Sequence, residues 1–331
     1  MKRILVIRGG AIGDFVLTLP AIKLLREAWP EARLEILGYK HIIALAENRF
    51  YADATRSIEY GPLASFFANG ADLPTELANY FASFDLIISY LFDPDRVFEH
   101  NVRRCGVELF LAGAPKATGC EHAAVQLARP LEELGLVLKT RAAELHPSAA
   151  DRELAHSLIE SLREPLVAIH PGSGSESKNW PVGRWQALAR SLLESADAGS
   201  IFVLGGEADE GALRSFRAEP SEGAIAFAEN LPLPVLAAAL QSCALFLGHD
   251  SGISHIAAAV ATPCLLLFGP TDPDVWAPQN PGVRILRARS QSIAHLPVEE
   301  VAETVRLLSP HTRARKFPAR SPSCHPEPRG R

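Results

Sequence analysis

The sequence predicts an α/β protein with two Rossmann-like domains, each built on a parallel sheet. A chain of 331 residues is long for one core and suits two domains of about 150 residues each. Short apolar runs alternate with helical patterns, which is typical of βαβ units. The runs in the second half are continuously apolar, as expected where helices cover both faces of a sheet.

The first half is expected to form an N-terminal domain at residues 1–150. Its predicted strands cover 3–7, 33–37, 84–89 and 106–111, and its predicted helices cover 15–28, 41–47 and 122–134. The segment 139–150 combines a proline and a serine with several alanines, and we interpret it as the linker.

The second half repeats this alternation in a C-terminal domain at residues 151–310. Its predicted strands cover 166–170, 201–204, 244–248 and 264–268, and its predicted helices cover 182–193, 234–241, 253–261 and 298–308. Residues 311–331 combine arginines with prolines and serines, so we predict a basic, disordered tail there.

Composition excludes several classes of function. Hydrophobic residues make up 47% of the chain and the net charge is −5, so it provides no global basic field and nucleic acid is not an expected partner. The first apolar run ends at Arg8, too early for a signal peptide. The five cysteines form no CxxC pair, which argues against a zinc site and a disulfide framework. These features favour a cytoplasmic location.

The first of three glycine-rich loops covers residues 8–14 and lies between a predicted strand and a predicted helix. Ligands bind at such positions in open α/β sheets. The spacing matches neither the dinucleotide fingerprint nor the P-loop. Asp14 is expected at the helix N-cap, where it is either a capping carboxylate or a functional one.

The second loop covers residues 170–181 and precedes the helix that contains Trp185. Successive glycine and serine amides can form an anion-binding nest, and Lys178 can add a positive charge. The alternative is a solvated loop with a surface lysine.

The third loop covers residues 248–259. Asp250 and Ser251 stand at a predicted helix start, where Gly252 allows an anion to reach free amides. A metal site formed by His249, Asp250 and His255 is disfavoured, because the spacing does not put both histidines on one helical face. His255 is either a core histidine or a ligand contact.

Together the segments GGAIGDFVLTLPA, HPGSGSESKNWP and HDSGISHIAAA with FGPTDP resemble the glycosyltransferase family 9 heptosyltransferases of lipopolysaccharide core synthesis. The match runs in order from residue 1 to about residue 310. The resemblance implies a GT-B fold, in which two Rossmann-like domains face a central cleft, and a metal-independent reaction without a cofactor. It also implies inverting transfer of a heptose or related sugar from an ADP-sugar, typically ADP-heptose, to a lipid-linked saccharide acceptor.

The resemblance also implies roles for individual residues. Asp14 matches the proposed catalytic base, and Lys178 matches a lysine that contacts the donor phosphate and sugar. The other implied donor-binding positions are Ser173 and Gly174 at the diphosphate, Glu229 at the ribose, Asp250 at the sugar, and Ser251, Gly252 and His255 in the phosphate-binding turn.

Two other functions are compatible with the same donor site. One is a GT-B-fold sugar-nucleotide epimerase, and the other is a non-catalytic nucleotide-sugar-binding homologue. The implied lipid acceptor also predicts peripheral contact with the inner face of the inner membrane. The pair Phe66 and Phe67 could contribute to that contact, or else belong to a buried helix.

Overall fold

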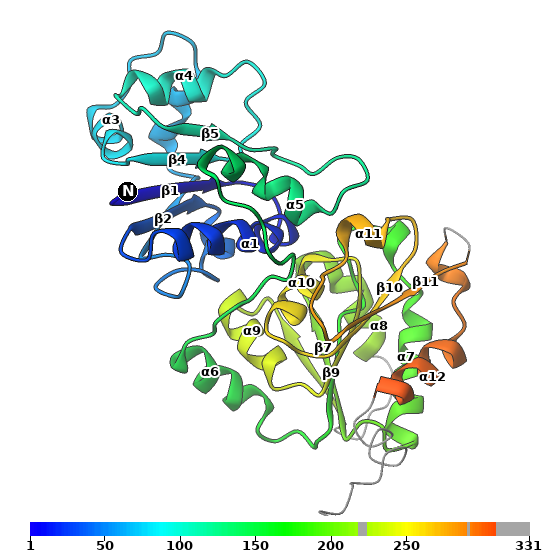
Figure 1. Ribbon diagram of the computed structural model, residues 1–331. Coiled ribbons are helices and arrows are strands. Elements are labelled where there is room, and N and C mark those ends of the chain that lie inside the picture. Colours follow the sequence, from blue (N-terminus) through cyan, green and yellow to red (C-terminus); the bar gives the residue numbers. More distant parts are fainter. Residues whose placement is uncertain (218–223, 290–291, 309–331) are drawn as a thin grey trace, which may run out of the picture.

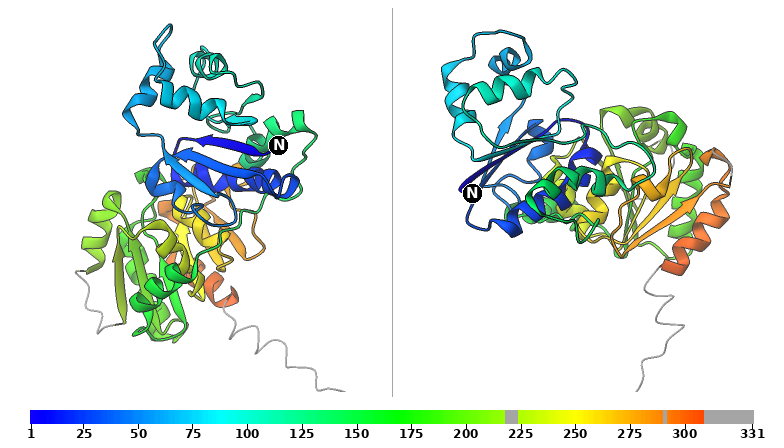
Figure 2. Two further views of the ribbon diagram at one scale, coloured as in Figure 1. Left: turned by 90° about the vertical axis from the view of Figure 1, so that its left-hand side faces the viewer. Right: turned by 45° about the horizontal axis from the view of Figure 1, so that its top comes forward.

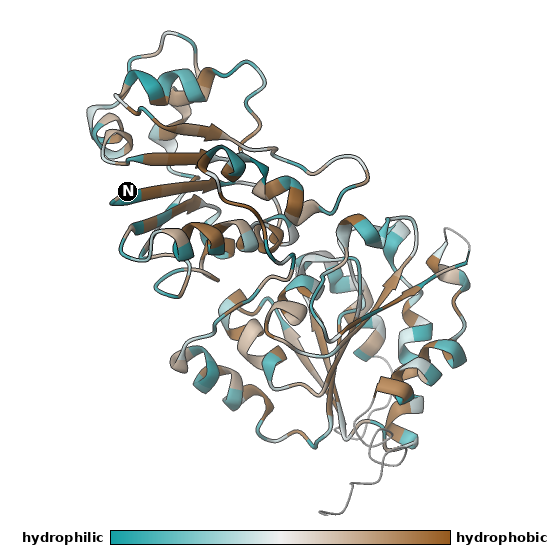
Figure 3. Ribbon diagram, in the orientation of Figure 1, coloured by the Kyte–Doolittle hydropathy of each residue, from teal (hydrophilic) through white to brown (hydrophobic). Residues whose placement is uncertain are grey.

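The computed structural model consists of two parallel sheets flanked by helices (Figure 1). It describes residues 1–217, 224–289 and 292–308, so the predicted tail at 311–331 lies outside the described residues. Figure 3 shows that strands in both sheets are predominantly hydrophobic, while the surrounding helices carry both hydrophilic and hydrophobic residues. The prediction of a two-domain α/β protein is confirmed.

The N-terminal sheet has five parallel strands in the order β3-β2-β1-β4-β5. The central strand β1 pairs with β2 on one side and β4 on the other. The strands are β1 Arg3–Arg8, β2 Arg33–Gly38, β3 Ala54–Ser57, β4 Leu86–Ser89 and β5 Phe110–Ala112. The helices are α1 Ile12–Ala28, α2 Lys40–Ile43, α3 Thr75–Ala82, α4 Val97–Arg104 and α5 Ala123–Ala128, with 3-10 helices at Gly61–Phe67 and Arg129–Leu134.

The C-terminal sheet has six parallel strands in the order β11-β10-β9-β6-β7-β8. The strands are β6 Leu166–Ile169, β7 Ser200–Gly205, β8 Ile225–Glu229, β9 Leu245–His249, β10 Cys264–Phe268 and β11 Val283–Arg287. The helices are α6 Ala149–Ile159, α7 Val182–Glu194, α8 Glu210–Arg217, α9 Leu233–Gln241, α10 Gly252–Ala259, α11 Pro273–Trp276 and α12 Val298–Leu308, with 3-10 helices at Glu176–Lys178, Glu207–Asp209 and Ile293–His295.

The central strands of the C-terminal sheet are buried on both faces, which explains why β6, β9 and β10 are largely apolar. Val167 and Ile169 point into a core that includes Trp185 of α7, whereas Ala168 between them points into the core under α9 and α10. Successive residues of a strand face opposite sides, so a strand covered on both sides needs apolar residues throughout.

The helix predicted at 41–47 ends at Ile43 in the structure, and two other predicted helices differ for local reasons. The first helix begins at Ile12 and its N-cap is Ala11, so the prediction of Asp14 at the N-cap is wrong. The loop glycines end at Gly10, and the chain becomes helical before it reaches Asp14. The predicted helix 122–134 changes to a 3-10 helix at Arg129. Pro130 has no N–H for the α-helical hydrogen bond, which accounts for the change.

The chain is irregular from Gly135 to Ser148, between the 3-10 helix Arg129–Leu134 and α6. This helix begins at Ala149 after the N-cap Ser148, and it packs against α9 of the C-terminal sheet. The domain boundary near residue 150 stays a prediction, although the position of α6 is consistent with it.

The two halves meet where α1 and α10 pack together (Figure 2). A Cβ atom on Gly252 would lie 2.7 Å from Cβ of Ile12 and 3.0 Å from the Gly13 nitrogen, so only glycine allows this approach. Hydrogen bonds from the Leu145 amide to the Ala259 carbonyl and between His122 Nε2 and the Ala277 carbonyl add to the contact. The N-termini of α1 and α10 therefore lie next to each other.

The residues considered for lipid contact have unequal exposure. In the 3-10 helix Gly61–Phe67, Phe66 is buried and Phe67 is 46% exposed, so the expectation of a buried helix holds for one of the pair. Within the described ranges, the structure has no helix long and apolar enough to cross a membrane.

Candidate active site

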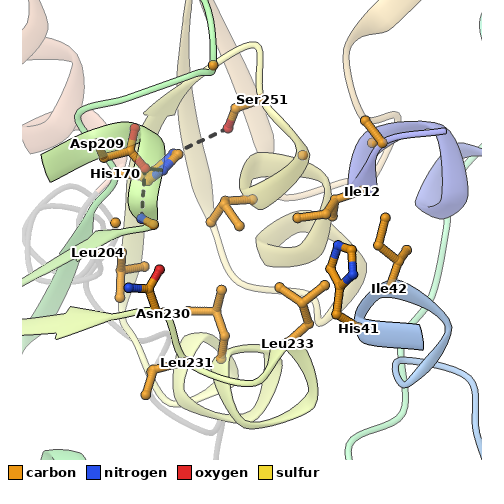
Figure 4. Close-up of a pocket in the computed structure, with 18 of the residues that line it drawn as sticks. Ile12, His41, Ile42, His170, Leu204, Asp209, Asn230, Leu231, Leu233 and Ser251 are labelled. Atoms are coloured by element: carbon orange, nitrogen blue, oxygen red, sulfur yellow. Dashed lines mark hydrogen bonds and ion pairs between the residues drawn. The ribbon is translucent and has the colours of Figure 1, made fainter. Parts of the chain in front are cut away.

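A cavity of about 860 Å³ lies between the two domains, and all three glycine-rich loops contribute to its wall (Figure 4). The N-terminal domain contributes Gly10 to Gly13 and the turn that carries Tyr39 and His41. The C-terminal domain contributes residues from four segments: 170–174, 204–209, 228–236 and 251–253. The loops therefore share one site although they are far apart in the sequence.

One end of the cavity is polar and is organised around His170, directly after β6. Its Nε2 atom is 3.2 Å from Oδ2 of Asp209, and its Nδ1 atom is 3.4 Å from Oγ of Ser251 (Figure 4). The Asp209 carboxylate also accepts a hydrogen bond from the Gly206 amide. His170 thus connects the ends of β6 and β7 to the N-terminus of α10.

Asp209 stays ionised at this position. Burial alone would raise its pKa, but the hydrogen bond and charge of His170, together with the Gly206 amide, lower the pKa overall. Gly172 allows the second loop to lie against this carboxylate, since a Cβ atom there would be 1.6 Å from Oδ1 of Asp209.

His249, the last residue of β9, holds the second loop in place through two hydrogen bonds. Its Nε2 atom accepts a hydrogen bond from the Trp180 amide, so the Nδ1 atom carries the proton and donates to the Gly172 carbonyl at 3.3 Å. Both ring nitrogens are used, which leaves neither for the metal site considered above. Burial lowers the pKa of His249 to about 3 and keeps the ring neutral.

We expect acid to destabilise the protein through His249. The pKa of this group is lower in the folded state than its ordinary value of 6.5, so its neutral form stabilises the fold fully above pH 6.5. This contribution is lost as the pH falls from 6.5 towards 3, at about 1.4 kcal/mol per pH unit. Urea unfolding of the wild type and His249→Gln between about pH 7 and pH 5 measures it, and equal slopes would contradict the prediction.

Asp14 lies in the first turn of α1 with a partly accessible carboxylate. Its Oδ2 atom accepts a hydrogen bond from the Ala11 amide at 3.0 Å, and its Oδ1 atom is 3.6 Å from Nη2 of Arg8. Arg8 is buried and also donates to the Pro115 carbonyl at 2.8 Å. The Asp14 side chain is 28% exposed, so a hydroxyl group from solvent or substrate can reach it.

Lys178 and Asp250 form an ion pair with 2.8 Å between Nζ and Oδ2. His255 lies close enough to Asp250, Asp14 and Lys178 for the charges of all three to change its pKa. Burial dominates and lowers the pKa of His255 to about 4, so the ring is neutral near pH 7. The structure therefore brings four of the predicted site residues into one region.

The predicted residues fall into three groups in the structure. Ser173, Gly174, Ser251 and Gly252 line the cavity. A second group lies next to the cavity and consists of Asp14, Lys178, Asp250 and His255. Gly13 of the cavity wall is close to this group, since a Cβ atom on Gly13 would lie 3.4 Å from Cδ2 of His255. Glu229 is outside the wall and pairs with Arg217. The proposed roles of all nine remain predictions.

Several residues of the cavity wall are not among those predicted from the sequence. Asp209 and Asn230 follow β7 and β8, and His41 follows β2. The stretch Gly205-Gly206 after an apolar strand carries the same signal as the three predicted loops and could have identified the first of these segments.

A sequence model of glycosyltransferase family 9 (heptosyltransferase) matches residues 117–305, more than half of the chain. The chain belongs to this family. The family resemblance and the assignment as a glycosyltransferase are thus confirmed.

Individual members of the family match over most of the chain. Lipopolysaccharide heptosyltransferase 3 of Escherichia coli is 26% identical over 285 residues, which cover 80% of this chain and 83% of that protein. The structure of the E. coli ADP-heptose lipopolysaccharide heptosyltransferase II aligns with a TM-score of 0.76 at 18% identity, over 95% of this chain and all of that one. The E. coli heptosyltransferase WaaC with ADP-2-deoxy-2-fluoro heptose aligns with a TM-score of 0.66 at 17% identity, over 92% and 99% of the two chains. The predicted GT-B fold is confirmed.

Proposed function

We propose that the protein is an inverting glycosyltransferase that moves a heptose, or a related sugar, from an ADP-sugar to a saccharide of the lipopolysaccharide core. The main support is that the three glycine-rich loops, which come from both domains, line one cavity beside Asp14 and the Lys178–Asp250 pair. The names of the family members support the substrate class, since they include lipopolysaccharide heptosyltransferases and a complex with an ADP-heptose analogue.

The cavity suits a nucleotide sugar because its two parts differ in polarity. Ser173, Gly174, Ser251 and Gly252 provide amides and hydroxyls for a diphosphate, at the positive end of the α10 dipole. A wall formed by β8 and the start of α9 is largely apolar and suits the flat faces of a nucleobase. Lys178 adds positive charge from the adjacent region.

In the proposed reaction, Asp14 acts as the general base. Its carboxylate takes the proton of the acceptor hydroxyl as the oxygen attacks the anomeric carbon. The new C–O bond forms on the face opposite the leaving diphosphate, whose bond to the anomeric carbon breaks, so the configuration inverts. The amides of the α10 turn and Lys178 stabilise the negative charge on the leaving group, and the scheme requires no metal ion.

Transfer assays with purified protein test this proposal. We expect ADP-heptose and a truncated lipopolysaccharide acceptor to give a product one heptose heavier by mass spectrometry, with inverted anomeric configuration by NMR and undiminished turnover after chelation. Retention of configuration would contradict the inverting mechanism, and loss of turnover on chelation would contradict metal independence.

The same assay separates the alternative functions. Conversion of the nucleotide sugar to a different nucleotide sugar without acceptor would identify an epimerase. Donor binding by calorimetry without transfer to any lipid acceptor would identify a non-catalytic homologue. The lipid acceptor of the proposed reaction would also bring the protein to the inner face of the inner membrane.

A further inference from the structure

The described wall of the cavity itself carries no permanently positive side chain for a bound diphosphate, so the charge of Lys178 comes from outside it. Among the described residues that line it, none is lysine or arginine. Lys178 and Arg8 act from the adjacent region, and each is partly balanced by a carboxylate, Lys178 by Asp250 and Arg8 by Asp14. A nucleotide sugar brings a negative charge on each phosphate, and burying that charge without a cation is unfavourable.

Histidine is the remaining side chain that can change charge near neutral pH. Three buried histidines near the site are unsuitable. Burial lowers the pKa of His122, His249 and His255, and for the last two the values are about 3 and about 4. His249 also uses both ring nitrogens to hold the second loop. These rings stay neutral when an anion binds nearby.

His170 differs from these histidines because it faces a carboxylate and the cavity at the same time. Asp209, from the turn after β7, lies 3.2 Å from Nε2, and Ser251, at the N-terminus of α10, lies 3.4 Å from Nδ1. The neutral His249, on β9, also interacts electrostatically with His170. Figure 4 shows His170 between Asp209 and Ser251 at the cavity wall.

We propose that His170 is protonated when the donor binds and that the resulting imidazolium is the cavity's own positive charge for the diphosphate. Nε2–H donates to Asp209 in either state. In the neutral ring Nδ1 accepts from the Ser251 hydroxyl, whereas in the imidazolium Nδ1–H becomes a donor. The Ser251 hydroxyl, whose other side-chain partner is Oγ of Ser254 at 3.1 Å, then no longer donates to His170 and can donate to a phosphate oxygen instead. The proton comes from solvent, and no covalent bond to the ligand forms.

This inference rests on the proposed function, because it requires a nucleoside diphosphate in the cavity. It makes Asp209 a positioning residue, which keeps the imidazolium in place and balances its charge. It also gives donor binding a pH dependence that a purely structural hydrogen bond between His170 and Asp209 would not produce.

The test is the affinity of ADP for the wild type and His170→Gln, measured by calorimetry at about pH 6.5 and pH 8.5. Glutamine keeps a donor towards Asp209 but cannot become positive. We expect His170→Gln to bind about tenfold more weakly at the lower pH, and within about threefold of the wild type at the higher pH. Calorimetry in buffers of different ionisation enthalpy gives the number of protons taken up on binding. This number should be larger for the wild type than for the variant. Any protonation of ADP itself contributes equally to both and cancels in the difference.

Two further variants keep the result interpretable. Asp209→Asn should also reduce the proton uptake, because the imidazolium loses its counter-ion. His41→Gln removes a second histidine from the described wall of the cavity and should leave the uptake unchanged. Loss of the uptake in His41→Gln would overturn the assignment to His170. Thermal unfolding of each variant shows whether it folds.

The outcomes also separate this inference from the proposed function. Failure of the wild type to bind ADP would overturn the nucleotide assignment, and this inference with it. ADP binding that His170→Gln weakens equally at both pH values, with unchanged proton uptake, would overturn only the role of His170. It would leave His170 as a structural link between the two loops.

Discussion

Replacing Asp14 with asparagine is expected to lower kcat by about 10³-fold and to leave donor affinity within a few-fold. The asparagine carbonyl can still accept the hydrogen bond from the Ala11 amide, so the start of α1 is retained. It cannot take a proton from the acceptor hydroxyl. Steady-state transfer rates and calorimetric titration with the donor nucleotide measure the two effects separately.

Asp53→Asn is a matched control for this change. Asp53 also accepts a backbone hydrogen bond, from the Leu34 amide, and also pairs with an arginine, Arg26. Both variants remove a carboxylate from an arginine and should lower the melting temperature, but only Asp14→Asn should lower kcat. Weaker donor binding with unchanged kcat in Asp14→Asn would indicate a structural role for the carboxylate at the helix start.

The elements that could be predicted from the sequence are those with a strong local pattern. Strand β10 and helix α12 have the predicted bounds, because one is a continuous apolar run and the other has helical periodicity. The edge strands β3, β8 and β11 are not among the predicted strands. Every residue of β3 is half-buried, and its sequence includes Thr55 and Arg56, so it lacks both the apolar run and a clear alternation.

The site shows the same limit. The three loops were found because each combines glycines with a preceding apolar strand. The contact between His170 and Asp209 could not be predicted in this way. The two residues are 39 positions apart and come together because β6 and β7 are neighbours in the sheet. Likewise, no local pattern indicates that Gly252 lies against Ile12 across the two domains. Such contacts follow from strand order and domain arrangement.

Lys178→Ala is expected to lower kcat/KM by at least about 10²-fold, the typical effect of losing one group that stabilises a developing negative charge. The substitution also leaves Asp250, which is 11% exposed, without its partner 2.8 Å away. An unpaired carboxylate beside the diphosphate would repel the donor. Transfer rates at limiting donor concentration measure the combined effect, and a change within a few-fold would contradict the role of Lys178.

The double variant Lys178→Ala/Asp250→Asn separates the two causes. If Lys178 acts only by neutralising Asp250, removal of both charges should restore most of the activity. If Lys178 itself stabilises the diphosphate, the double variant should remain as slow as the slower single variant, and this is the expected result. Lys23→Ala is the control, because it removes a similarly exposed lysine from an ion pair of 2.7 Å with Glu144. A comparable loss of kcat/KM in Lys23→Ala would mean that the effect of Lys178→Ala reflects stability and not contact with the donor.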